Sequence, residues 1–184
     1  MKKYLPYHTP DERWRIFNCP DYETYLNSYL IKGKFHCKVP KQILDDYVTI
    51  EHLMAIAYYH YPIYDEALSK LLRTIELATK LRCKELFISL TLESNNQKSI
   101  QLKKKTFNRL IEDLIKAEPE KNISHLLNNI KDLRNLLMHP ENHSYAGGIN
   151  YPAIISCVTA INILFAEERY FKTLKEKLSS YEKI

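Results

Sequence analysis

The chain has 184 residues, of which 45% are hydrophobic and 27% are charged, a composition typical of one soluble globular domain with a proper core. Only three glycines occur, which argues against a glycine-punctuated β architecture. The formal net charge of +5 and the isoelectric point near 8.9 permit an anionic partner such as nucleic acid without requiring one.

Residues 1–39 predict an N-terminal arm followed by a short helix. Prolines recur among aromatic and charged residues at the start of the chain, so this part is expected to be irregular. Trp14 and Phe17 are expected to pin the arm to the main body. The short helix is predicted to begin near Asp21, and Gly33 is its natural stop.

Residues 40–184 predict a helical bundle. Apolar residues recur every three to four positions in most of this part, which is the spacing of an amphipathic helix. Pro62 separates the first two helices, and the polar, asparagine-rich segment 90–101 predicts a loop. The helices are expected at about 40–57, 62–83, 103–117, 123–139 and 152–181. The predicted fold is all-α, a four-helix up-and-down bundle with an N-terminal helical extension.

The cysteines and the hydropathy pattern predict a cytoplasmic protein. The four cysteines, Cys19, Cys37, Cys83 and Cys157, form no CxxC pair and follow no signal-like start, so reduced thiols are expected. No apolar run is expected to approach the roughly 20 residues of a membrane span. We therefore expect no membrane partner.

The segment 132–140 places three chemically useful side chains at the end of an apolar helix. Asn135 and His139 are four residues apart and share a helix face, and Arg134 is adjacent to Asn135. Pro140 disfavours helical geometry at His139, which is therefore expected at the helix end. An arginine fork matches phosphate oxygens, and a histidine exchanges protons near neutral pH.

These residue types suit RNA cleavage without a metal or another cofactor. The 2′-hydroxyl attacks the adjacent phosphorus, so a base accepts its proton while an acid protonates the leaving 5′-oxygen. His139 can serve one of these roles, Arg134 can neutralise the charge that develops on the phosphorane oxygens, and Asn135 can orient either His139 or a phosphate oxygen. The other interpretation is structural. Arg134 caps the helix or forms a salt bridge, Asn135 is a surface amide, and His139 is a C-terminal helix residue that the helix dipole favours.

The spacing Arg134-Asn135-x-x-x-His139, inside its predicted helices, resembles the Arg-x₄₋₆-His motif of the HEPN superfamily. The resemblance covers about residues 40–180 and implies a helical bundle, usually a homodimer in which two motifs face one cleft. It implies Arg134, Asn135 and His139 as the site of a metal-independent endoribonuclease, as in toxins and defence systems. One ideal helix would point Arg134 and His139 about 140° apart, so the pair is expected to act across two chains.

The same resemblance permits a second function. Some HEPN-like proteins are non-catalytic modules that bind nucleotide, RNA or a protein partner, and some accompany an antitoxin or a nucleotidyltransferase. We expect catalysis if Arg134 and His139 lie open in a cleft within reach of one phosphate. We expect the binding module if Arg134 is engaged in a buried ion pair or if the 143–149 loop covers His139.

Four weaker signals have both a functional and a structural interpretation. His139 and His143 have a metal-binding spacing, but Pro140 interrupts the helix, and His36-Cys37 lacks partners at zinc spacing. The tyrosines of 58–64 can stack bases or pack in a core. Lys103-Lys104-Lys105 can follow a phosphate backbone or simply be solvated.

Overall fold

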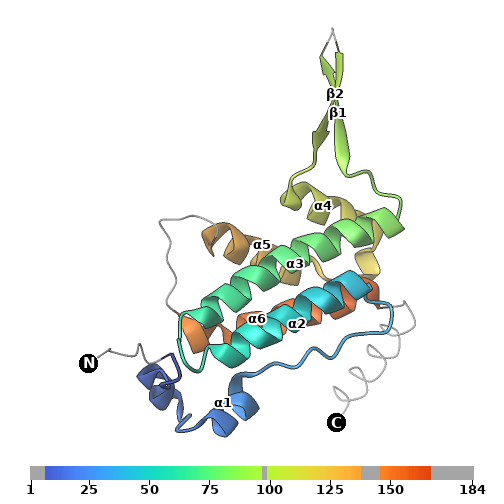
Figure 1. Ribbon diagram of the computed structural model, residues 1–184. Coiled ribbons are helices and arrows are strands. Elements are labelled where there is room, and N and C mark those ends of the chain that lie inside the picture. Colours follow the sequence, from blue (N-terminus) through green and yellow to red (C-terminus); the bar gives the residue numbers. More distant parts are fainter. Residues whose placement is uncertain (1–6, 97–98, 138–145, 167–184) are drawn as a thin grey trace.

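The computed structural model describes residues 7–96, 99–137 and 146–166, with the backbone alone for 93–96 and 99–102. The chain is mostly helical, as predicted, and has one small sheet (Figure 1). Its elements are η1 (Glu12–Phe17), α1 (Tyr22–Tyr29), α2 (Lys41–Ile56), α3 (Ile63–Glu85), β1 (Thr91–Asn96), β2 (Ser99–Lys104), α4 (Phe107–Ala117), η2 (Pro119–Lys121), α5 (Ser124–Leu137), η3 (Gly147–Asn150) and α6 (Tyr151–Phe165).

Helix α3 is the centre of the fold. It contacts α2, α4, α5, α6 and η3, and Figure 1 shows it crossing the middle of the helical body. Its apolar residues recur every three to four positions, so they form a stripe wide enough to meet several neighbours. Leu68, Leu71, Leu72 and Ile75 are completely buried. The predicted helices at 40–57 and 62–83 correspond to α2 and α3.

The N-terminal region packs against the same core. Trp14 is completely buried, its indole Nε1 donates to the carbonyl oxygen of Ala57 at 2.8 Å, and its ring meets Tyr25 at a centroid distance of 4.5 Å. Phe17 stacks on Tyr61. The prediction that Trp14 and Phe17 hold residues 7–20 to the body is confirmed.

Helix α1 begins where predicted but ends earlier. The side chain of Asp21 accepts from the backbone N–H of Thr24 at 2.8 Å and caps the helix. The predicted stop at Gly33 is wrong, because Leu30 is already extended. The following segment instead bonds to α2, where the Tyr47 hydroxyl donates to the carbonyl oxygen of Ile31 at 2.9 Å.

The predicted loop at 90–101 is a β-hairpin. Strands β1 and β2 pair antiparallel, with Thr91 opposite Lys104 and Asn96 opposite Ser99. The predicted helix at 103–117 therefore begins later, as α4 at Phe107, because the Thr106 side chain caps it by accepting from Arg109 N–H at 3.3 Å. Lys103 and Lys104 belong to the strand and not to a helix.

Asp65 of α3 fixes the start of the last helical segment. Its Oδ1 accepts from Gly147 N–H at 2.8 Å and from the Asn150 side-chain amide at 2.6 Å. Gly147 has a φ of +48°, and a Cβ there would lie 2.0 Å from the Tyr61 ring. Glycine is required at this position for both reasons.

The segment Gly147–Phe165 has the length and mean hydropathy of a membrane span, at least among the described residues. The expectation that no apolar run approaches that length is therefore wrong. The apolar character has another cause in the fold, because Ile154, Cys157, Ala160, Ile161 and Leu164 are completely buried and α6 contacts α3 and α5. This is the pattern of a core helix. The predicted continuation of this helix to 181 lies beyond the described residues.

Candidate functional site

Helix α5 places Arg134 on its packed side. Leu127 and Ile130 are buried, and Arg134 follows them by seven and four residues, so the three share one helix face. Asn135, one position on, is exposed. His139, the third member of the predicted site, lies outside the described residues, as does His143.

The Arg134 guanidinium is held by a carboxylate of α3. Its Nη2 donates to Glu76 Oε2 at 2.8 Å, and its Nη1 donates to Asn135 Oδ1 at 3.3 Å. The ring of Phe107, at the start of α4, lies 6.0 Å from its Cζ. Residues of α3, α4 and α5 therefore fix the position of one cation.

Glu76 has a second cation as partner. Lys80, one turn further along α3, donates to Glu76 Oε1 at 2.5 Å. Two cations therefore share one carboxylate, and the cluster of Glu76, Lys80 and Arg134 carries one net positive charge. Burial acts to raise the pKa of Glu76, but the hydrogen bond from Lys80 and the charges of Lys80 and Arg134 outweigh it, so the pKa is lowered. Glu76 is ionised at neutral pH.

The ion pair leaves part of the guanidinium available. The side chains of Arg134 and Glu76 are 30% and 20% exposed, so the pair is half-buried and not enclosed. Arginine has five N–H groups, of which one donates to Glu76 and one to Asn135, while the Nε–H is buried without a partner among the described residues. One N–H on each terminal nitrogen remains. That is enough for a phosphate to accept from the outer edge of the fork.

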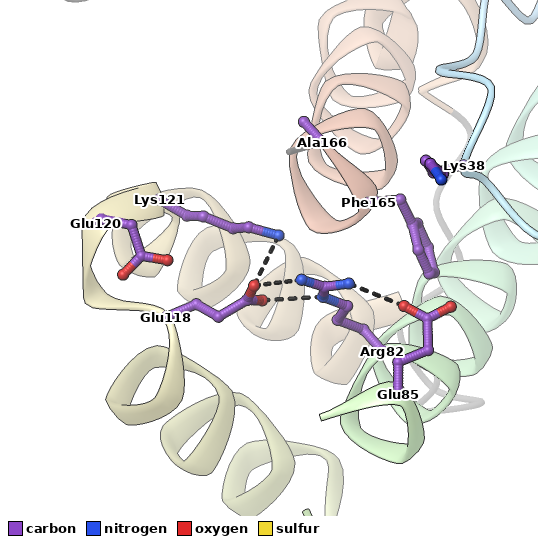
Figure 2. A pocket seen from close by; sticks show the side chains of 8 residues that line it. All are labelled: Lys38, Arg82, Glu85, Glu118, Glu120, Lys121, Phe165 and Ala166. Atoms are coloured by element: carbon purple, nitrogen blue, oxygen red, sulfur yellow. Dashed lines mark hydrogen bonds and ion pairs between the residues drawn. The ribbon is translucent and has the colours of Figure 1, made fainter. Parts of the chain in front are cut away.

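A second cluster of charges lines a cavity of about 450 Å³ at the C-terminal end of α3, beginning with Arg82 two residues after Lys80 (Figure 2). Arg82 is paired twice with Glu118, with its Nε donating to Oε2 at 3.0 Å, and its Nη1 donates to Glu85 at 2.9 Å. Lys121, whose side chain is 3% exposed, donates to the carbonyl oxygen of Leu164 at 2.6 Å and pairs with Glu118 at 3.1 Å.

This second cluster is a structural joint. Its cations and carboxylates pair with one another between α3 and the start of η2, as the dashed contacts of Figure 2 show, and the bond from Lys121 to Leu164 joins them to α6. Burial acts to raise the pKa of Glu118, but the bonds from Arg82 and Lys121 outweigh it and lower the pKa. None of the described side-chain atoms that line this cavity is buried without a hydrogen-bond partner. This cavity therefore has less to offer a ligand than the Arg134 cluster.

The other sequence signals within the described residues fall in the core or at the surface. Tyr58, Tyr61 and Tyr64 are buried in the aromatic cluster around Trp14, so the packing interpretation is confirmed for these three, whereas Tyr59 is partly exposed. No three His, Cys, Asp or Glu side chains gather as metal ligands among the described residues.

Sequence reasoning missed Glu76, Lys80 and Phe107, the partners of Arg134. A signal for one of them was present. Arg134 has the spacing of the buried face of its helix, and a charge on such a face needs a counter-ion. The spacing does not identify the carboxylate, because Glu76 lies 58 positions away in the sequence.

No protein-family model, curated protein or solved structure matches this chain.

Proposed function

We propose that this chain is a HEPN-type, metal-independent endoribonuclease in which Arg134 binds the phosphate that is cleaved. The observation that carries the proposal is the Arg134 cluster itself. A guanidinium is fixed by Glu76 at 2.8 Å and keeps N–H groups for a ligand beside an exposed amide, and the cluster retains a positive charge. A cation that is already oriented loses little freedom when an anion binds.

The reaction follows from the residue types. The 2′-oxygen forms a bond to phosphorus as the bond to the 5′-oxygen breaks, which leaves a 2′,3′-cyclic phosphate and a 5′-hydroxyl. In the proposal, His139 transfers one of the two protons of this reaction. Arg134 offsets the charge on the phosphorane oxygens, and Asn135 orients the phosphate. The HEPN resemblance further suggests a homodimer in which Arg134 acts beside His139 of the second chain.

The second candidate is a non-catalytic module that binds RNA or nucleotide through the same cluster. The ion pair with Glu76 favours it, because one edge of the guanidinium is engaged and cannot form a bidentate pair with phosphate. Because the Arg134–Glu76 pair is only half-buried, it does not decide between the nuclease and the non-catalytic module. An RNA cleavage assay separates the two.

The assay compares RNA cleavage by the purified chain and by its variants in the presence of EDTA. We expect wild type to cleave, Arg134→Ala to lose at least about a hundredfold in rate, and His139→Ala to lose about a hundredfold or more. Arg134→Lys should restore little, because an ammonium keeps the charge without the fork.

Arg15→Ala is the matched control. Arg15 is an exposed arginine of η1, and its replacement removes the same charge at a distant position of the chain. If wild type binds RNA but none of the proteins cleaves it, the non-catalytic module is the correct function. Equal cleavage by wild type and Arg134→Ala removes Arg134 from the mechanism.

A further inference from the structure

The β1–β2 hairpin projects beyond the helical body. Figure 1 shows it extending away from the ends of α3 and α4. Its base is tied down, since Lys105 N–H donates to the carbonyl oxygen of Leu90 at 2.9 Å and the Lys105 ammonium pairs with Asp113 of α4 at 2.7 Å. A two-stranded hairpin is marginally stable alone in water.

The arm concentrates positive charge. Segment 91–105 holds four lysines and one glutamate, which is a net charge of +3 out of +5 for the whole chain. Lys103 and Lys104 are exposed, and neither has an ion pair among the described residues, whereas Lys105 is neutralised by Asp113. Two uncompensated cations therefore follow one another at the end of β2, where successive side chains point to opposite faces of the strand.

These cations lie a short stretch of chain away from the Arg134 cluster. Lys104 precedes Phe107 by three residues, and the Phe107 ring lies 6.0 Å from Arg134 Cζ. Three residues span at most about 11 Å of chain, and a nucleotide strand advances about 3.4 Å per residue in a helix. A strand held at Arg134 can thus reach the two lysines within a few nucleotides.

We infer that the β1–β2 hairpin is an arm that binds the phosphate backbone of single-stranded RNA through Lys103 and Lys104, next to the Arg134 cluster. The identity of the ligand rests on the proposed function, but the binding does not require cleavage. The hairpin segment has no aromatic residue, so it lacks base-stacking platforms and the aromatic anchors of membrane-surface segments.

The test measures the affinity of the full chain for an oligouridylate with 2′-O-methyl groups between about 50 and 200 mM salt. The methyl groups remove the attacking hydroxyl, so binding is separated from cleavage. Each phosphate contact contributes about 0.7 to the slope of log K against log salt for a single strand. Lys103→Gln/Lys104→Gln should lower the slope by about 1.4 and weaken binding about 25-fold at 0.1 M salt.

Two matched variants control for charge and folding. Lys32→Gln/Lys41→Gln removes the same charge from two exposed lysines and should leave slope and affinity unchanged. Lys103→Arg/Lys104→Arg keeps the charges and should keep the slope. Circular dichroism and the thermal midpoint establish that each variant is folded.

Three results would overturn the inference: no binding by wild type at the lowest salt, an unchanged slope for Lys103→Gln/Lys104→Gln, or an equal loss in Lys32→Gln/Lys41→Gln. Displacement of the RNA by polyglutamate or anionic vesicles at equal charge would also overturn it, since the arm would then recognise another class of partner. If the chain does not cleave RNA but Lys103→Gln/Lys104→Gln still lowers the salt slope, the proposed nuclease activity is refuted and the RNA-binding role of the hairpin stands.

Discussion

The two arginine clusters of α3 differ in how completely they are neutralised. Arg82 meets Glu118 and Glu85, and Lys121 meets Glu118. Arg134, on α5, shares Glu76 with Lys80, and Glu76 is its one carboxylate partner among the described residues. The first arrangement stabilises a junction of three elements, and the second leaves positive charge beside an exposed amide. The comparison shows that a cavity is a poor guide to chemistry here, since the 450 Å³ cavity belongs to the neutralised cluster.

The largest expected difference is in stability. Glu118→Ala leaves Lys121 and Arg82 without their shared carboxylate, so the free energy of unfolding should fall by about 3 kcal/mol. Glu76→Ala breaks a half-buried pair and should cost about 1 kcal/mol. Urea denaturation measures both. Glu85→Ala, which removes the exposed partner of Arg82, should change the free energy of unfolding by less than about 0.5 kcal/mol. Similar losses in Glu118→Ala and Glu76→Ala would show that the two clusters do not differ in their contribution to stability.

Acid should reduce the contribution of Glu118. Its pKa is lowered in the folded chain below the usual value of 4.5, so the stabilisation is present above that pH and is lost as the pH falls through the folded pKa. The difference in unfolding free energy between wild type and Glu118→Gln should therefore be constant near neutral pH and shrink below about pH 4.5. A difference that grows on acidification would contradict the lowered pKa.

Removing a carboxylate should affect RNA binding at one cluster alone. Glu76→Gln removes the negative charge beside Arg134, so affinity for the 2′-O-methyl oligouridylate should rise about fivefold at 0.1 M salt, as for one added charge. Glu118→Gln should leave it unchanged, because Glu118 lies in the structural joint. Equal effects of both variants would show that total charge, and not the Arg134 cluster, governs binding.

The sequence predicted the helices of the body well because their spacing is a local property. Apolar residues at helical spacing and prolines at the boundaries predicted α2 and α3. The packing role of Trp14 could also be predicted, since a tryptophan ring is on average highly buried in a folded protein.

The hairpin and the partner of Arg134 required non-local information. Segment 90–101 has few apolar residues to show strand alternation, and its structure depends on pairing between positions such as Thr91 and Lys104. Glu76 meets Arg134 only after α3 and α5 pack together. The sequence predicted the residue types of the site, while the neighbours that set its charge came from the fold.

The end groups of RNA incubated with the chain in EDTA test the central claim most directly. We expect 2′,3′-cyclic phosphate and 5′-hydroxyl ends with wild type and with Arg15→Ala, and intact RNA with Arg134→Ala over the same period. Products with a 5′-phosphate, or cyclic-phosphate products in equal yield from Arg134→Ala, would contradict it.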